Sequence, residues 1–158
     1  MTALETLYHR YSGGLYAYAF SILKRQAAAE DAVSEAFVRL YRHASAGKSV
    51  RDAKALLFTI CRNVSLDIIR REGRQETLPD EEATADVPDR ADALAVRAAL
   101  AALEDIERDI VTLHCVAGFK HREKSELMGM PEGTVRWNYG EAVKKLRREL
   151  GGCGNERV

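Results

Sequence analysis

Four side chains that could contact nucleic-acid bases lie close together near the C-terminus: Arg136, Trp137, Asn138 and Glu141. In the major groove of DNA, an arginine can bind guanine through two hydrogen bonds, and an asparagine can bind adenine in the same way. Trp137 could contact a thymine methyl group or pack within the protein, and the sequence leaves both options open. Together these side chains predict a surface that reads the edges of base pairs.

The segment that carries them has the pattern of a helix-turn-helix. Gly129 predicts a tight turn after a short helix, and Pro131 suits the first turn of the next helix, where its missing N–H has no partner to lose. We expect that second helix from about Pro131 to Leu150, because apolar residues recur at helical spacing. These are Val135, Tyr139, Ala142, Val143 and Leu146. In such motifs the second helix enters the major groove, although two ordinary core helices can show a similar pattern.

The composition predicts an all-α protein, since helix formers dominate the 158 residues, proline is scarce and β-branched runs are absent. The net charge is zero, but seven acidic residues and one basic residue lie between Glu76 and Asp92. Outside this stretch the chain has 23 basic and 17 acidic residues, a surplus that favours a polyanionic partner. We therefore expect two small domains, residues 1–73 and 94–158, joined by a flexible acidic linker at residues 74–93.

Several other kinds of chemistry lack support in the sequence. The three cysteines are widely spaced and include no CxxC pair, so we expect neither a disulfide framework nor a metal site. There is no phosphate-binding loop and no nucleophile with a base at recognisable spacing, and we expect no cofactor and no catalytic residues. No segment resembles a signal peptide or a membrane span, which predicts a cytoplasmic protein without membrane contact of its own.

Three helices are predicted in the N-terminal half. A helical period from Leu4 to Ile22 continues through Gly13 and Gly14, which favours one helix over two. A second helix is expected near residues 28–43, with an apolar side formed by Val33, Ala36, Phe37, Leu40 and Tyr41. The sequence Ser49–Asp52 resembles a capping box, so Ser49 is predicted to cap a third helix.

Three separated motifs together resemble one known family. They are residues 29–40 (AEDAVSEAFVRL), residues 56–63 (LLFTICRN) followed by Arg70 and Arg71, and residues 133–136 (GTVR). In this combination and order they resemble an extracytoplasmic-function (ECF) RNA polymerase sigma factor of the sigma-70 family. The resemblance implies a transcription initiation factor, not an enzyme, that binds core RNA polymerase, recognises promoter DNA with two domains and helps to melt it.

The resemblance also implies roles for particular residues. The core-polymerase-binding face, which would dock on the β′ clamp coiled coil, is Asp31, Ser34, Glu35, Val38 and Arg39. The minus-ten element, read as melted single strand, would contact the loop at residues 44–51 and Arg62, Asn63, Asp67, Arg70 and Arg71. The minus-thirty-five element would contact Arg136, Trp137, Asn138 and Glu141, with phosphates bound by Lys120, His121, Arg122, Lys144 and Lys145. The family further implies contact with the β flap and control by an anti-sigma factor.

Two other classes of protein compete with this interpretation. A stand-alone helix-turn-helix regulator would explain the C-terminal half but leave the two N-terminal motifs without a purpose. A small helical enzyme or adaptor has no supporting motif. One residue breaks the expected pattern, since Lys124 occupies a position where the helical period expects an apolar side chain; if it is buried there, Lys124→Ile should raise the melting temperature.

Overall fold

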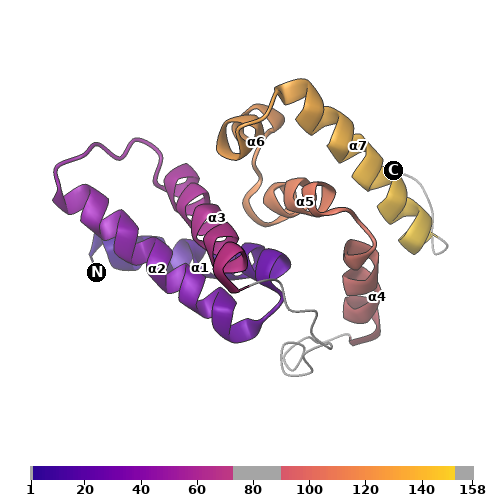
Figure 1. Ribbon diagram of the computed structural model, residues 1–158, viewed down its shortest axis with the longest axis horizontal. Helices are drawn as coiled ribbons and strands as arrows, with labels where there is room; N and C mark the ends of the chain where they lie inside the picture. The colour runs from indigo at the N-terminus through magenta and orange to yellow at the C-terminus, as the bar shows by residue number, and fades with distance from the viewer. Residues whose placement is uncertain (1, 73–89, 152–158) are drawn as a thin grey trace. The chain divides into compact units, whose positions relative to one another are not determined.

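The structure is a computed structural model that describes residues 2–72 and 90–151. The chain divides into two compact units, Met1–Leu78 and Pro79–Val158. Seven helices and no strands form within the described residues (Figure 1). The predicted all-α class, with two small helical domains and a C-terminal helix-turn-helix, is confirmed.

The N-terminal unit contains three long helices, α1 (Ala3–Leu23), α2 (Gln26–Ser45) and α3 (Ala53–Glu72), and each packs against the other two. Helix α1 runs without a break through Gly13 and Gly14, as predicted. Apolar side chains from all three helices fill the core, including Leu15, Phe37 and Leu57. The buried Tyr18 and Phe58 rings meet at 5.8 Å between centroids, so an aromatic pair joins α1 to α3.

The start of α3 differs from the prediction. Ser49 does not cap this helix, because α3 begins three residues later than the capping-box pattern suggested. The carboxylate of Asp52 accepts a hydrogen bond from the N–H of Ala55 at 3.1 Å, and this bond satisfies one of the free donors at the helix start. Aspartate and serine are equally good capping residues, and in this helix Asp52 is the one that caps.

The C-terminal unit contains α4 (Arg90–Ala101), α5 (Asp105–Ala117), α6 (His121–Met128) and α7 (Glu132–Leu150). Helices α4, α5 and α6 each pack against α7 (Figure 1). Buried Leu103, Val111 and Ala142 form a core cluster, and Leu100, Tyr139 and Leu146 pack against it. Residues 74–89 of the predicted linker lie outside the described residues, whereas its last residues, 90–93, belong to α4.

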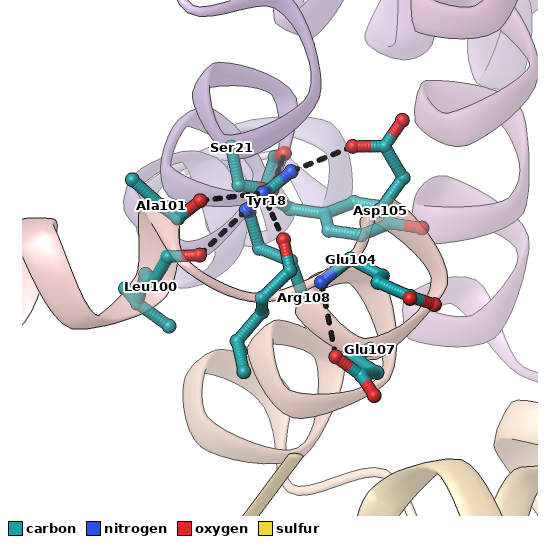
Figure 2. A network of polar contacts seen from close by, with 9 residues as sticks. Tyr18, Ser21, Leu100, Ala101, Glu104, Asp105, Glu107 and Arg108 are labelled. Atoms are coloured by element: carbon teal, nitrogen blue, oxygen red, sulfur yellow. Dashed lines mark hydrogen bonds and ion pairs between the residues drawn. The ribbon is translucent and has the colours of Figure 1, made fainter. Parts of the chain in front are cut away.

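A buried arginine joins α4 to α5. The Arg108 guanidinium donates hydrogen bonds to the carbonyl oxygens of Leu100 at 2.9 Å and Leu103 at 2.6 Å, and it pairs with Asp105 at 2.9 Å (Figure 2). The last carbonyl groups of a helix have no partner within that helix. Arg108 therefore satisfies acceptors at the C-terminal end of α4 and sets the turn into α5.

Candidate nucleic-acid interface

The turn between α6 and α7 is built around Gly129. Its φ of 69° lies in the left-handed region, and its N–H donates to the Ser125 carbonyl at 2.9 Å. The Ser125 hydroxyl donates to the carbonyl of Met130 at 2.6 Å, so one side chain links the end of α6 to the residue before Pro131. Helix α7 begins at Glu132, one residue later than predicted, so Pro131 occupies the N-cap position and does not lie in the first turn. The turn predicted at Gly129 is thus present, and it orients α7.

The outward face of α7 carries Arg136 and Trp137. Trp137 is 65% exposed, so the option of packing within the C-terminal core does not apply to it. Arg136 is also exposed and pairs with Glu132 one turn earlier, at 2.6 Å. An exposed ion pair of this kind contributes at most about 1 kcal/mol, so a ligand can displace it at low cost. Both side chains can therefore reach a surface laid against α7.

Other predicted contact residues on α7 are held by neighbours within the unit. The Asn138 side chain is half-buried and its amide donates to the Thr134 carbonyl at 2.9 Å, along its own helix. The ammonium of Lys145 contacts both carboxylate oxygens of the buried Glu107, at 2.9 and 3.0 Å. Lys144 is exposed and lies 3.4 Å from Glu141. In this arrangement Asn138 and Lys145 already have internal partners, whereas Lys144 faces solvent.

The Glu107–Lys145 ion pair also joins α5 to α7. Burial raises the pKa of Glu107, but hydrogen bonds from the Glu104 N–H and from Lys145 outweigh it and lower the pKa overall. Hydrogen bonding to Glu107 raises the pKa of Lys145. Both shifts favour the charged forms, which is the behaviour of a structural ion pair.

Around the start of α6, two of the three predicted phosphate contacts are exposed, Lys120 and Arg122. His121 is half-buried and its ring meets that of Tyr139 at 5.0 Å between centroids. Burial, with the nearby charge of Lys124, lowers the pKa of His121 and favours the neutral ring. Lys120 and Arg122 are consequently better placed than His121 to bind an anion.

Lys124 is fully buried, with 0% of its surface exposed, which confirms that it occupies a core position. Its ammonium nitrogen lies 4.5 Å from the centroid of the Tyr139 ring, and it has no hydrogen-bond partner among the described residues. Burial lowers the pKa of Lys124 to about 8. A cation–π contact is thus the main compensation for the hydration that the ammonium loses.

The outward face of α3 carries the predicted minus-ten residues. Asn63, Arg70 and Arg71 are exposed, while Arg62 and Asp67 are half-buried. Asp67 pairs with Arg70 at 2.8 Å and with Arg71 at 3.6 Å, and the hydrogen bond from Arg70 is the main cause of a lowered pKa for Asp67. Asp67 therefore holds two arginine side chains near the end of α3. The loop before α3 is exposed, but the first two residues of the predicted loop, Ala44 and Ser45, belong to α2.

The outward face of α2 carries the predicted polymerase-binding residues. Asp31, Ser34, Val38 and Arg39 are exposed, and Arg39 pairs with the half-buried Glu35 at 2.9 Å. The opposite side of α2 is buried in the core, as the periodicity predicted, except at its C-terminal end. Tyr41, predicted on the apolar side, is 60% exposed, so the prediction is wrong for this residue.

A few findings limit the chemistry of the described residues. Within residues 2–72 and 90–151, no group of three or more His, Cys, Asp or Glu side chains is arranged to hold a metal ion. In the same part of the chain, no helix is both long and apolar enough to cross a membrane. Cys61 is buried as a free thiol whose pKa is raised by burial to about 12, in keeping with a core residue.

Comparison with known proteins identifies the family. Residues 7–75 match the family model for sigma-70 region 2, and residues 93–146 match the model for sigma-70 region 4. The ECF RNA polymerase sigma factor SigL of Mycobacterium tuberculosis is 30% identical over 98% of this chain and 92% of its own. The chain belongs to the ECF RNA polymerase sigma factors. This ECF sigma factor is therefore a transcription initiation factor that directs RNA polymerase to promoters, and its family is regulatory and not catalytic.

Two further comparisons show a relative of similar sequence and a structure of similar fold. The ECF RNA polymerase sigma factor SigM of Bacillus subtilis is 24% identical over 98% of this sigma factor and 97% of its own chain. Among solved structures, the sigma factor RpoE of Bartonella quintana, crystallised with the anti-sigma factor NepR, superimposes with a TM-score of 0.78 at 22% identity. That match covers 95% of this chain and 98% of the other, and it shows a shared fold.

Proposed function

We propose that the two units of this sigma factor divide promoter recognition between them, with limits close to residues 1–73 and 94–158. The N-terminal unit binds core RNA polymerase and reads the minus-ten element as a melted single strand. The C-terminal unit reads the minus-thirty-five element in the major groove with α7. The observation that carries the proposal is that polar and charged residues line the outward faces of α2, α3 and α7 in a chain that matches both sigma-70 regions.

On the N-terminal unit, the outward face of α2 docks on the β′ clamp coiled coil. Val38 is the apolar centre of this face, and the paired Glu35 and Arg39 flank it. On α3, the exposed Asn63 amide can both donate to and accept from the edge of an unstacked base. Arg70 and Arg71, held by Asp67, bind phosphates of the same strand.

On the C-terminal unit, Arg136 and Trp137 contact base edges, and Lys120, Arg122 and Lys144 contact phosphates. Asn138, Glu141, His121 and Lys145 support this surface from within the unit, since each contacts a neighbour there. The β flap of the polymerase is a further partner of this unit. By analogy with the Bartonella quintana sigma factor, which was solved with an anti-sigma factor, we also propose that an anti-sigma factor holds this chain inactive.

Reconstitution with core polymerase tests the proposal. The purified chain should bind core polymerase and select promoters with two separated elements from a library of random DNA. Absence of any core binding would refute the polymerase-directing role proposed for these faces.

Two pairs of variants separate the roles of α2 and α3. Arg39→Glu should lose core binding, whereas Arg10→Glu, a matched charge reversal on an exposed part of α1, should keep it. Asn63→Ala should keep core affinity and lose open-complex formation, which permanganate footprinting of unpaired thymines measures. Unchanged melting by Asn63→Ala would exclude Asn63 as a reader of the melted strand.

A further inference from the structure

The outward face of α7 combines one large apolar side chain with two positions that have no side chain at all. Gly133 lies four residues before Trp137 and Gly140 three residues after it, and these spacings place all three on the same side of a helix. Trp137 is 65% exposed between them. Two of the four helical neighbours of the indole on this side of α7 are therefore bare backbone, and the other two are Thr134 and Glu141.

Nothing inside the unit explains the two glycines. A Cβ atom added at Gly133 or Gly140 would meet nothing within 4 Å, and neither residue is among those with positive φ. Gly140 lies in the middle of α7, where glycine costs about 1 kcal/mol of helix stability relative to alanine. Glycine on an exposed helix face lets another molecule approach the backbone closely. The glycines and the exposed indole thus indicate a partner that comes close to α7 at this point.

The charges on the same face indicate what that partner is. Lys144, Arg147 and Arg148 follow Gly140 along the exposed side of α7. Cationic side chains that flank a contact surface favour a polyanion. Building on the proposed function of α7, the partner is the promoter duplex, and its major groove is the surface that admits a helix.

We propose that Trp137 reads the 5-methyl group of a thymine in the minus-thirty-five element, and that Gly133 and Gly140 let α7 enter the groove deeply enough for this contact. The thymine methyl is the apolar group that base pairs present in the major groove, and an indole is an apolar surface of matching chemistry. Removing the methyl takes away one buried carbon and leaves the hydrogen bonds of the base pair unchanged.

Replacement of single thymines by deoxyuracil tests the contact directly. The full chain with core polymerase is bound to a promoter selected from random DNA, and each thymine of the minus-thirty-five element, on either strand, is replaced in turn. For the wild-type protein, affinity should fall about fourfold at one position, the effect of one buried methyl group. Trp137→Ala should bind less tightly and show no deoxyuracil effect at that position, while its melting temperature stays unchanged because the side chain is exposed.

The glycines are tested by a substitution that favours folding. Gly140→Ala should stabilise α7 yet weaken binding to the selected promoter at least tenfold, so misfolding cannot explain the loss. Gly13→Ala is the matched control, since Gly13 is also a helical glycine with open space around it, but on α1. It should leave promoter binding unchanged.

Any of the following results would overturn the inference: a wild-type protein indifferent to deoxyuracil, an equal deoxyuracil effect in Trp137→Ala, or normal binding by Gly140→Ala. Weakened core binding by Trp137→Ala with unchanged DNA preference would show that the indole faces the polymerase, and would also overturn it. Failure to select any two-element promoter would instead refute the proposed function on which the inference rests.

Discussion

Lys124 provides the sharpest test of the physical reasoning, because a fully buried ammonium destabilises the unit that holds it. Its pKa falls from 10.5 to about 8 on folding, which corresponds to about 3 kcal/mol of lost stability at neutral pH. The contact with the Tyr139 ring offsets part of this lost stability, by about 1 kcal/mol for a cation over an aromatic ring. Lys124→Met, which keeps an unbranched side chain only one atom shorter, should therefore raise the stability of the C-terminal unit by about 2 kcal/mol, or on the order of 10 °C in melting temperature.

The pH dependence has a definite sign. In the unfolded chain Lys124 titrates near 10.5 and in the folded chain near 8, so between these values the unfolded state binds more protons. The penalty is fully present below pH 8 and disappears as the pH rises toward 10.5. The advantage of Lys124→Met over wild type should accordingly shrink by about 2 kcal/mol between pH 7 and pH 9.5. His114, His121 and Cys115 lie near the same aromatic ring or amine. The pKa of His121 is lowered by burial and by Lys124, so its ring is neutral between pH 7 and pH 9.5 and adds nothing to the difference in this range.

Urea unfolding followed by circular dichroism at several pH values measures both effects. Lys144→Met is the matched control, since its side chain is 67% exposed and its removal should change stability little at any pH. Lys124→Ile should behave like Lys124→Met. A Lys124→Met protein no more stable than wild type at pH 7, or a difference that does not vary with pH, would refute the argument that the buried charge is destabilising.

Three further outcomes follow from the C-terminal unit. Gly129→Ala should destabilise it by about 1–2 kcal/mol in urea unfolding, because an alanine must adopt the left-handed φ of 69°; an unchanged midpoint would mean that the turn can relax. Arg108→Ala should cost about 3 kcal/mol and speed hydrogen exchange in α4, because buried carbonyl groups lose their donor; exchange unchanged there would exclude this role. Lys145→Met should cost about 2 kcal/mol at pH 7. Because the pKa of Glu107 is lowered by folding, the stability that this pair provides is lost as the pH falls below 4.5, so the variant should lose less stability in acid than wild type does.

Periodicity and turn chemistry predicted most of the helices from the sequence alone. Helix α1 continues through two glycines because the apolar repeat on either side stays in phase, and Gly129 forms its turn because glycine accepts a left-handed φ. Local sequence does not fix the start of α3, since Ser49 and Asp52 are both good capping residues and it does not rank them. The prediction for Tyr41 is wrong for another reason: its phase on α2 is apolar, but it lies beyond Leu40, the last residue of α2 that is buried.

The candidate site was harder to predict, because the availability of a polar side chain depends on its neighbours. Asn138 has the right chemistry for adenine, yet its amide binds the carbonyl of Thr134. Lys145 has the right charge for phosphate, yet the buried Glu107 lies 38 residues away in sequence and holds it. Likewise, the capping of α4 by Arg108 depends on how α5 packs. Sequence therefore predicts which groups a face of a helix contains, and the fold decides which of them are available to a ligand.

Under the proposed function, the pairing of charges on α7 explains why an apolar reader would be useful there. Arg136 is bound to Glu132 and Lys144 lies near Glu141, so each cation must exchange a carboxylate for DNA when it binds. Exposed pairs of this type contribute at most about 1 kcal/mol, so the exchange is inexpensive, but its net gain is correspondingly small and falls with salt. An indole that buries a methyl group makes no such exchange, and its contribution does not depend on salt. On a helix with paired charges, the apolar contact proposed for Trp137 is therefore the part of recognition expected to persist at high ionic strength.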